Sequence, residues 1–407
     1  MRGHALKDDV YDHAEFPSTS GSISAAHQEA NLIRQHITSA THVAAAVALL
    51  LLPLLLQAFG THFVRTVDTC LLYVLLALGM NIVVGYAGLL DLGYVAFYAV
   101  GAYLFALLAS PHLTHNFALL AAMFPAGLHA AWWFTIPLGA ALAAFFGTLL
   151  GIPTLKLRGD YLAIVTLGVG EIVRILINNL GHPVNITDGA KSLGLIDPVN
   201  FFGLDLGQTL HLGSYHLASV TLYYDLFLAL VVLAVTVSLR LQNSRIGRAW
   251  MAIRDDEVAA EAMGINTRNL KLLAFAIGAS FGGVAGALFA TFQGFISPEA
   301  FSLQESVMIV AMVVFGGIGH IPGVILGAVL LTAFPEMLRY VVGPLQAMTD
   351  GRLDAGILRQ LLIALAMIVT MVLRPRGLWP SPEHGKSLRA DADSANASTN
   401  RAARPDA

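Results

Sequence analysis

The residues best placed to do chemistry are ionisable side chains inside long apolar stretches. Glu171 and Arg174 stand three positions apart within residues 159–179, a spacing that puts both on one helix face. They can form a structural pair or line a polar path for a solute. Asp91 follows the sequence GYAGLL and can cap the helix that begins there. Because charges inside a membrane are costly, such residues are functional candidates.

Catalytic motifs are missing from the sequence. The nearest match to the phosphate-binding loop GxxxxGK[ST] is PSPEHGKS, residues 380–387, which has Pro380 in place of the first glycine. Neither HExxH nor GxSxG occurs. Cys70 is the only cysteine, and His320 has no second ligand at metal-binding spacing. We therefore expect no catalytic residue, no metal site and no cofactor, and a chain that is neither an ATPase nor a hydrolase.

A short helix is predicted within the polar segment 244–269, SRIGRAWMAIRDDEVAAEAMGINTRN. Asp255 is its expected N-cap, and Asp256 and Glu257 fall in the first turn, where acidic groups favour the helix dipole. Gly264 is expected just after the last turn.

This helix is too short to be stable alone. Val258, Ala262 and Ile265 recur at helical spacing and form a small apolar stripe. The spacing leaves two docking partners equally open, the chain's own membrane core or a cytoplasmic partner.

Glycines mark two further places. Gly278, Gly282 and Gly286 share one helix face, which favours close helix packing. Residues 315–328, FGGIGHIPGVILGA, predict either a tight turn between two spans or a broken helix at membrane depth.

The elements that must position these residues are membrane-spanning helices. Of the 407 residues, 56% are hydrophobic and 12% are charged, and the mean hydropathy is +0.70. The small net charge of −3 does not suggest nucleic-acid binding. A span takes roughly 20 apolar residues, and the candidates are 41–60, 66–86, 91–109, 131–153, 159–179, 221–241, 270–292, 304–320, 323–342 and 356–374.

Basic residues orient these spans, because Lys and Arg concentrate on the cytoplasmic side. With both termini inside, Lys156, Arg158, the basic residues of 240–271, Arg374 and Arg376 lie inside. The outer loops then hold only Arg65, Lys191 and Arg352. We expect an all-α, polytopic membrane protein with about ten spans. Residues 1–40 form a polar cytoplasmic extension without the pattern of a signal peptide, 41–375 the transmembrane domain, and 376–407 a disordered tail. The weaker stretch 116–129 could be re-entrant or interfacial, and counting it as a span would invert the topology of everything after it.

The sequence resembles the LivM-type permease subunits of bacterial ABC importers for branched-chain amino acids. The match lies in residues 85–108, 157–175, 186–196, 244–288 and 297–328, of which 244–288 is the most specific. Glu261, Ala262 and Gly264 resemble the Glu-Ala-Ala…Gly signature of importer permeases, with Met263 at the third position.

The resemblance implies an ABC importer permease fold in the bacterial inner membrane and four kinds of partner. These are a second, LivH-like permease, two cytoplasmic ATPase subunits, a periplasmic binding protein and membrane lipid. Segment 244–269 would dock on the ATPase through Arg245, Gly247, Arg248, Arg254, Asp255, Glu257, Glu261 and Gly264. The translocation path would include Asp91, Tyr161, Thr166 and Glu171. Asp188 and Lys191, in the periplasmic stretch 181–220, would contact the binding protein.

Other functions stay open. A permease of the same family could carry urea, short amides or other amino acids. An ion-coupled secondary transporter would need intramembrane acids, of which Glu171 is nearly the only candidate in mid-span. A membrane anchor without transport is a third class, which the glycine-loosened spans disfavour.

Overall fold

The computed structural model describes residues 48–58, 60–124, 127–154, 157, 159–182, 185–201, 204–212, 215–348, 355–374 and 377–379. The chain divides into a unit that ends at Leu55 and a second unit from Leu56 onward. The first helix is Ala48–Ala58. The expected extension 1–40, Lys156, Arg158 and all of the expected tail except 377–379 lie outside the described residues.

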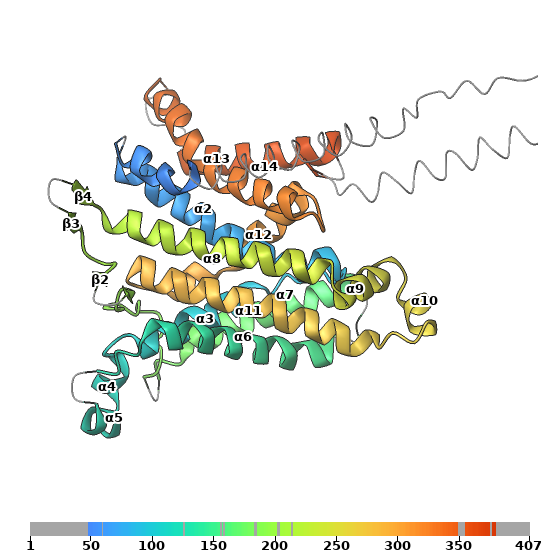
Figure 1. Cartoon of the computed structure of the whole chain (residues 1–407), viewed down its shortest axis with the longest axis horizontal. Helices are drawn as coiled ribbons and strands as arrows, with labels where there is room; N and C mark the ends of the chain where they lie inside the picture. Colours follow the sequence, from blue (N-terminus) through green and yellow to red (C-terminus); the bar gives the residue numbers. More distant parts are fainter. Residues whose placement is uncertain are drawn as a thin grey trace, which may run out of the picture. The chain divides into compact units, whose positions relative to one another are not determined.

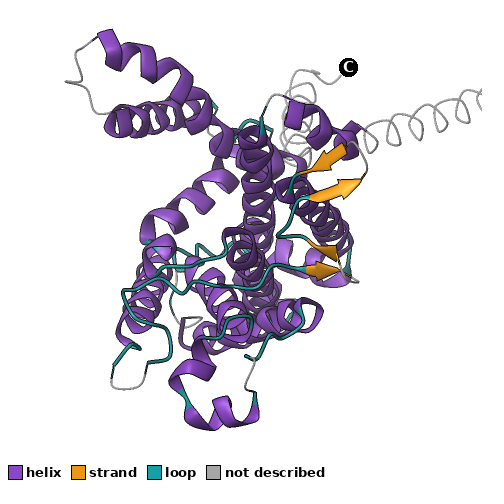
Figure 2. Ribbon diagram, turned by 90° about the vertical axis from the view of Figure 1, so that its left-hand side faces the viewer, coloured by secondary structure: helices purple, strands orange, loops and turns teal. Residues whose placement is uncertain are grey.

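Helices dominate the second unit (Figures 1 and 2). They are α2 (Thr61–Met80), η1 (Asn81–Tyr86), α3 (Val95–Leu108), α4 (His112–Asn116), α5 (Ala118–Met123), α6 (Trp132–Thr154), α7 (Asp160–Asn179), α8 (Ser219–Gln242), α9 (Arg245–Asp255), α10 (Glu257–Ala262), α11 (Thr267–Gln293), η2 (Pro298–Phe301), α12 (Leu303–Gly316), α13 (Ile321–Met348) and α14 (Ala355–Leu373).

The strands of the described part form two small antiparallel pairs. β1 (Asn200–Phe201) pairs with β2 (Leu204–Asp205), and β3 (Leu210–Leu212) pairs with β4 (Tyr215–Leu217). Both lie between α7 and α8, outside the helical core (Figure 2). The fold is therefore helical with a small β addition in one loop.

α11 is the central packing helix of this unit and lies beside α6, α3 and α2 (Figure 1). Its glycines allow this approach: a Cβ at Gly286 would lie only 2.0 Å from the carbonyl oxygen of Tyr98 on α3. A Cβ at Gly278 would meet the Val83 side chain at 2.4 Å. The prediction that the Gly278–Gly286 face packs tightly is confirmed.

Backbone hydrogen bonds join loops at both ends of the helices. At one end, Leu193 pairs with Ile296, and Asp197 donates to Ala109 beyond the end of α3. At the other end lie α9 and α10 (Figure 1). There Trp379 donates to Gly316, so residues 377–379 belong to the folded part.

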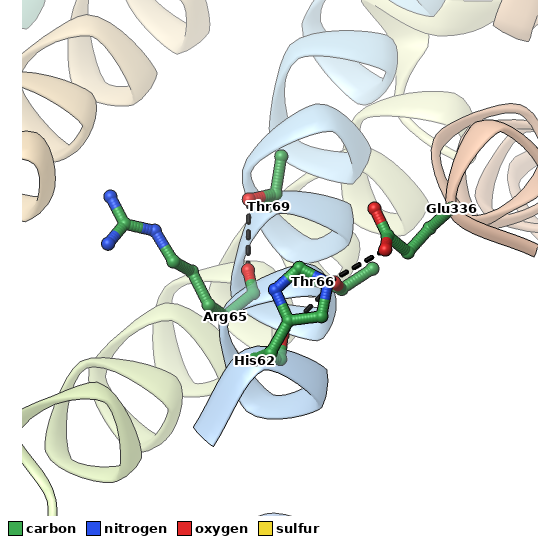
Figure 3. A network of polar contacts seen from close by, with 5 residues as sticks. All are labelled: His62, Arg65, Thr66, Thr69 and Glu336. Atoms are coloured by element: carbon green, nitrogen blue, oxygen red, sulfur yellow. Dashed lines mark hydrogen bonds and ion pairs between the residues drawn. The ribbon is translucent and has the colours of Figure 1, made fainter. Parts of the chain in front are cut away.

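Polar side chains tie α2 to its neighbours at the first of these ends (Figure 3). His62 Nε2 lies 2.7 Å from Glu336 Oε1 of α13. On the opposite side of α2, Arg65 bonds to Gln293 of α11, and its guanidinium carbon lies 5.3 Å from the centre of the Phe292 ring. These contacts hold α2 between α13 and α11.

Within the described part, 5 helical segments are long and apolar enough to cross a membrane, so the chain is a multi-pass membrane protein. They are Thr61–Tyr86, Trp132–Thr154, Ser219–Gln242, Thr267–Gln293 and Ile321–Leu338. The expected spans at 91–109 and 304–320 correspond to α3 and α12, each of 14 residues, or about 21 Å of helix.

The two ambiguous stretches have definite structures. Residues 116–129 contain the end of α4 and the six-residue α5, which are too short to span. Within 315–328, α12 ends at Gly316 and α13 begins at Ile321, with Gly317 and Gly319 at positive φ in between. The chain thus makes a tight turn between α12 and α13. Irregular backbone is found instead between η1 and α3, where Asp91 is buried.

Candidate functional site

Segment 244–269 is called the coupling segment below, after the role that the resemblance implies for it. It begins with the well-anchored helix α9. Ser244 caps this helix by accepting a hydrogen bond from the Gly247 amide at 3.1 Å. Trp250 is fully buried, and its indole donates to the Leu270 carbonyl at 2.7 Å. Ile253 is buried on the same side. Because an anchored aromatic and a cap fix both position and entry angle, α9 is held firmly against α11.

The short helix α10 begins one residue later than expected. Asp256, not Asp255, is its N-cap and accepts hydrogen bonds from the Val258 and Ala259 amides at 2.9 and 3.0 Å. Asp255 is the last residue of α9. The Asp256 backbone is extended, with φ −154° and ψ 111°, which is the conformation that an N-cap requires.

The expected end of α10 at Gly264 is confirmed. Gly264 has a φ of +85°. Its amide bonds to the Glu261 carbonyl at 2.9 Å, and the Ile265 amide bonds to the Ala260 carbonyl at 3.1 Å. This pair of bonds is the Schellman motif, in which a left-handed glycine reverses the chain.

α10 is attached to the rest of the chain on one side only. Lys271 Nζ of α11 lies 2.6 Å from Glu257 Oε1, and Ala260 is 4% exposed. Val258 is 67% exposed and Met263 is 84% exposed. Ala262 is exposed as well. Most of the predicted apolar stripe is thus uncovered within this chain.

The basic residues of α9 divide into two groups. Arg245 and Arg248 are exposed. Arg254 points inward: its Nη1 donates to the Gly85 carbonyl at 2.5 Å, and its Nε lies 3.9 Å from the exposed Asp255 carboxylate. Sequence reasoning grouped all three together, because the side on which a helix packs is not visible in the charge pattern.

Asp91 and Thr166, two of the residues expected to line the translocation path, lie close together. Asp91 is 1% exposed, and its Oδ1 accepts from the Gly93 amide at 2.8 Å. Thr166 Oγ1 of α7 accepts from the Leu92 amide at 3.0 Å. Both line a cavity of about 10 Å³. Asp91 therefore stabilises the turn at Gly93, whereas the expected cap of α3 is not made: α3 has no side-chain cap.

The other two path candidates lie elsewhere on α7. Tyr161 is 72% exposed. Glu171 pairs with Arg174 at 2.9 Å, as the spacing predicted, and both side chains are about one-third exposed. Ile164 and Ile172 are exposed too. α7 thus turns Thr166 inward and presents an apolar face with one ion pair.

In the loop after α7, Asp188 has a structural task. Asn185 donates to Asp188 Oδ1 at 2.9 Å, and the Asp188 amide donates back to Asn185 Oδ1 at 2.8 Å. Lys191 is exposed. Two exposed apolar residues at this end were not predicted from the sequence. Leu195 is 80% exposed at a φ of 56°, and Phe295, on the segment paired with it, is 52% exposed.

The sequence also did not predict a larger cavity, which lies between α12 and α14. Its volume is about 530 Å³. The amides of Gln304 and Gln360 are its polar groups, and the other lining residues are Val307, Met308, Ala311, Ile363, Ala364 and Met367. Apolar walls with a few polar groups are typical of small-molecule sites. Uncharged glutamines at helical positions carry no sequence signal, because only packing brings the two helices together.

Metal ligands are not clustered in the described part of the chain. No group of three or more His, Cys, Asp or Glu side chains there could hold an ion. Cys70 is buried.

Comparison with known proteins identifies relatives over most of the chain. The family model described as "Branched-chain amino acid transport system / permease component" matches residues 63–371. The Escherichia coli (strain K12) protein "High-affinity branched-chain amino acid transport system permease protein LivM" is 40% identical over 333 residues, covering 79% of this chain and 70% of that protein.

More distant relatives include a second kind of permease. "High-affinity branched-chain amino acid transport system permease protein LivH" of Salmonella typhimurium is 26% identical over 317 residues, covering 76% of this chain and 92% of that protein. A "Probable branched-chain amino acid transport permease protein LivM" of Methanocaldococcus jannaschii is 27% identical over 254 residues, covering 60% of this chain and 67% of that protein. No solved structure matches significantly.

Proposed function

We propose, from the premise that this chain belongs to the family of permease components of branched-chain amino acid transport systems, that it forms half of the membrane pathway of an ABC importer. The solutes would be leucine, isoleucine and valine. The chain makes and breaks no covalent bond, and ATP hydrolysis belongs to separate subunits. Membership in this family also disfavours the ion-coupled and anchor functions.

The observation that carries the proposal is the construction of the coupling segment. α9 is anchored by the buried Trp250, while α10 leaves Val258 and Met263 exposed. An exposed apolar tip on a rigid base is suited to insertion into a groove of another protein. We propose that this groove belongs to a cytoplasmic ATPase subunit, and that Arg245, Arg248, Asp255 and Glu261 surround the contact.

The proposed position of the coupling segment also sets the membrane orientation. The coupling segment would lie in the cytoplasm of a bacterium, with both termini on that side and the chain in the inner membrane. Arg240 and Arg374 lie at the same end as this segment, and Lys191 and Arg65 lie at the other. The excess of basic residues at the first end supports this orientation. The five candidate spans, together with Ala48–Ala58, α3, α7, α12 and α14, would give about ten crossings.

For the solute path, two surfaces are candidates. The α12–α14 cavity has apolar walls and two glutamine amides, which suit an aliphatic side chain. The exposed face of α7, with Tyr161 and the Glu171–Arg174 pair, would face the second, LivH-like permease across the pathway. Glu171 would stay neutralised by Arg174 there.

At the outer end, the periplasmic binding protein would dock on the loops after α7 and α11. Leu195 and Phe295 are exposed on paired segments, and the Lys191 ammonium lies nearby in sequence. Asp188 would hold the loop in shape. An apolar contact with a basic neighbour suits a partner with an acidic rim.

Transport by the assembled system tests the proposal. The chain is co-expressed with the permease, ATPase and binding-protein subunits encoded beside it, purified and reconstituted in liposomes. We expect uptake of radiolabelled leucine that requires both ATP and the binding protein. Uptake driven by an ion gradient alone would contradict the proposal. Calorimetry of the binding protein with leucine, urea, acetamide and other amino acids identifies the solute.

A further inference from the structure

Arg254 belongs to the coupling segment but faces the membrane core. We propose that Arg254 is a positioning residue, through which the coupling segment moves segment 85–93, and that this segment in turn moves α7. Residues 85–93 are called the relay segment below. The inference rests on the proposed function, since it assumes that an ATPase moves the coupling segment.

The first contact of the relay joins Arg254 to η1, at the end of the span that begins with α2. α2 and η1 form one continuous span, Thr61–Tyr86, and Gly85 lies in its last turn. Carbonyl groups in the last turn of a helix lack intrahelical partners. Arg254 Nη1 donates to the Gly85 carbonyl at 2.5 Å, and a cation at this end also favours the helix dipole. The coupling segment therefore caps the most buried span of the unit.

The Arg254 side chain is enclosed by glycines. A Cβ at Gly88 would lie 2.6 Å from Arg254 Cγ, and a Cβ at Gly319 would lie 3.0 Å from Nη1. The Gly319 amide in turn donates to Asn81 Oδ1 of η1 at 2.9 Å. Because no side chain separates these groups, a shift of Arg254 toward Gly88 or Gly319 displaces the relay segment or the α12–α13 turn.

The next contact joins the relay segment to α7. The Leu92 amide donates to Thr166 Oγ1 at 3.0 Å, and a Cβ at Gly93 would lie 2.1 Å from the Thr166 carbonyl oxygen. Asp91 fixes this turn through the Gly93 amide. Backbone atoms on both sides touch, so the relay segment cannot slide without moving α7.

The local structure gives this relay a part that can rearrange. η1 is a π-helix, in which the Ala87 amide bonds five residues back to Ile82 at 3.3 Å. Such turns are rare and frequently occur at functional sites. Arg254 also lines a cavity of about 280 Å³ with Gln242 and His320, so the guanidinium has space on one side. An unbroken series of contacts thus joins Arg254 of the coupling segment to Thr166 of α7, and coupling between two sites travels through such series of packed groups.

The test measures leucine taken up per ATP hydrolysed, in the reconstituted complete transporter. The variants are Arg254→Ala, Arg254→Lys and Thr166→Val, with Arg240→Ala as the matched control. Arg240 is an exposed arginine at the same end, in the last turn of α8. Only complexes that keep their ATPase subunits through purification are reconstituted, so the ratio reports on assembled molecules.

We expect Arg254→Ala to keep the ATPase subunits bound through purification and to lower the ratio about tenfold. Arg254→Lys retains a cation at the helix end and should lower it only about threefold. Arg240→Ala should leave the ratio unchanged. The double variant Arg254→Ala/Thr166→Val should be no worse than the more severe single variant, because both changes break one relay.

Other outcomes overturn the inference in distinguishable ways. Loss of the ATPase subunits from Arg254→Ala would make Arg254 a docking residue and leave the proposed function standing. An unchanged ratio, an equal loss in Arg240→Ala, or effects that multiply in the double variant would exclude the relay. Absence of ATP-driven uptake with the unsubstituted chain would contradict the proposed function itself.

Discussion

Asp255 and Asp256 are neighbouring carboxylates with different tasks. Both residues fit an N-cap by type, and the sequence pattern selected the first. The structure selects Asp256, since its backbone is extended while Asp255 still belongs to α9. The cap position depends on where the preceding helix stops, and α9 continues to Asp255.

Replacing the cap should loosen α10. We expect Asp256→Ala to destabilise this helix by about 1 kcal/mol, because the Val258 and Ala259 amides lose their acceptor. Hydrogen exchange followed by mass spectrometry should show these amides exchanging about fivefold faster. Asp255→Ala is the matched control, and Asp256→Ser should keep most of the protection. Equal exchange in the two alanine variants would contradict the assignment of the cap.

At the scale of single elements, glycines have different roles in helices of similar composition. On α11 the face of Gly278, Gly282 and Gly286 permits contact with α2 and α3. On α7, a Cβ at Gly168 would meet nothing within 4 Å. Recurrence every four residues predicted the first role correctly. An isolated glycine gives no such information, because its neighbours are set by tertiary packing.

Replacement by alanine should have different effects on stability at Gly286 and at Gly168. Gly286→Ala places a Cβ 2.0 Å from the Tyr98 carbonyl oxygen and should cost about 1–3 kcal/mol of stability. Gly168→Ala should be neutral or stabilise by about 0.5–1 kcal/mol, since alanine loses less backbone entropy in a helix. Thermal unfolding of the purified protein in detergent gives the comparison. A lower unfolding temperature for Gly168→Ala than for Gly286→Ala would refute the packing argument.

For the whole molecule, the proposed orientation places the two ends of the helices on opposite sides of the membrane. Met263 at the tip of the coupling segment is 84% exposed, and Leu195 at the other end is 80% exposed. Cys70 is 4% exposed, so the native thiol should react slowly from either side.

Single cysteines at these positions test the orientation. In a Cys70→Ser background and without partner subunits, Leu195→Cys should react with a membrane-impermeant maleimide in intact spheroplasts. Met263→Cys should react only in inverted vesicles or after permeabilisation. Labelling of both positions from the same side would show that the two loops share a compartment and that the number of spans between them is different.

The sequence by itself determined the membrane class, the places of the long helices and the family. These properties depend on composition, on apolar runs of about bilayer length and on motifs read along the chain. It also predicted the Glu171–Arg174 pair and the end of α10 at Gly264, because both depend on residues a few positions apart.

Only the tertiary structure decided which side chains of the coupling segment face outward. Arg245, Arg248 and Arg254 look alike in sequence, yet Arg254 alone among them reaches the Gly85 carbonyl, 169 positions away along the chain. The tertiary structure likewise brought Asp91 to Thr166, and Gln304 to Gln360. Contacts of this kind depend on how helices rotate against one another, and that rotation is set by packing over the whole bundle rather than by any local pattern.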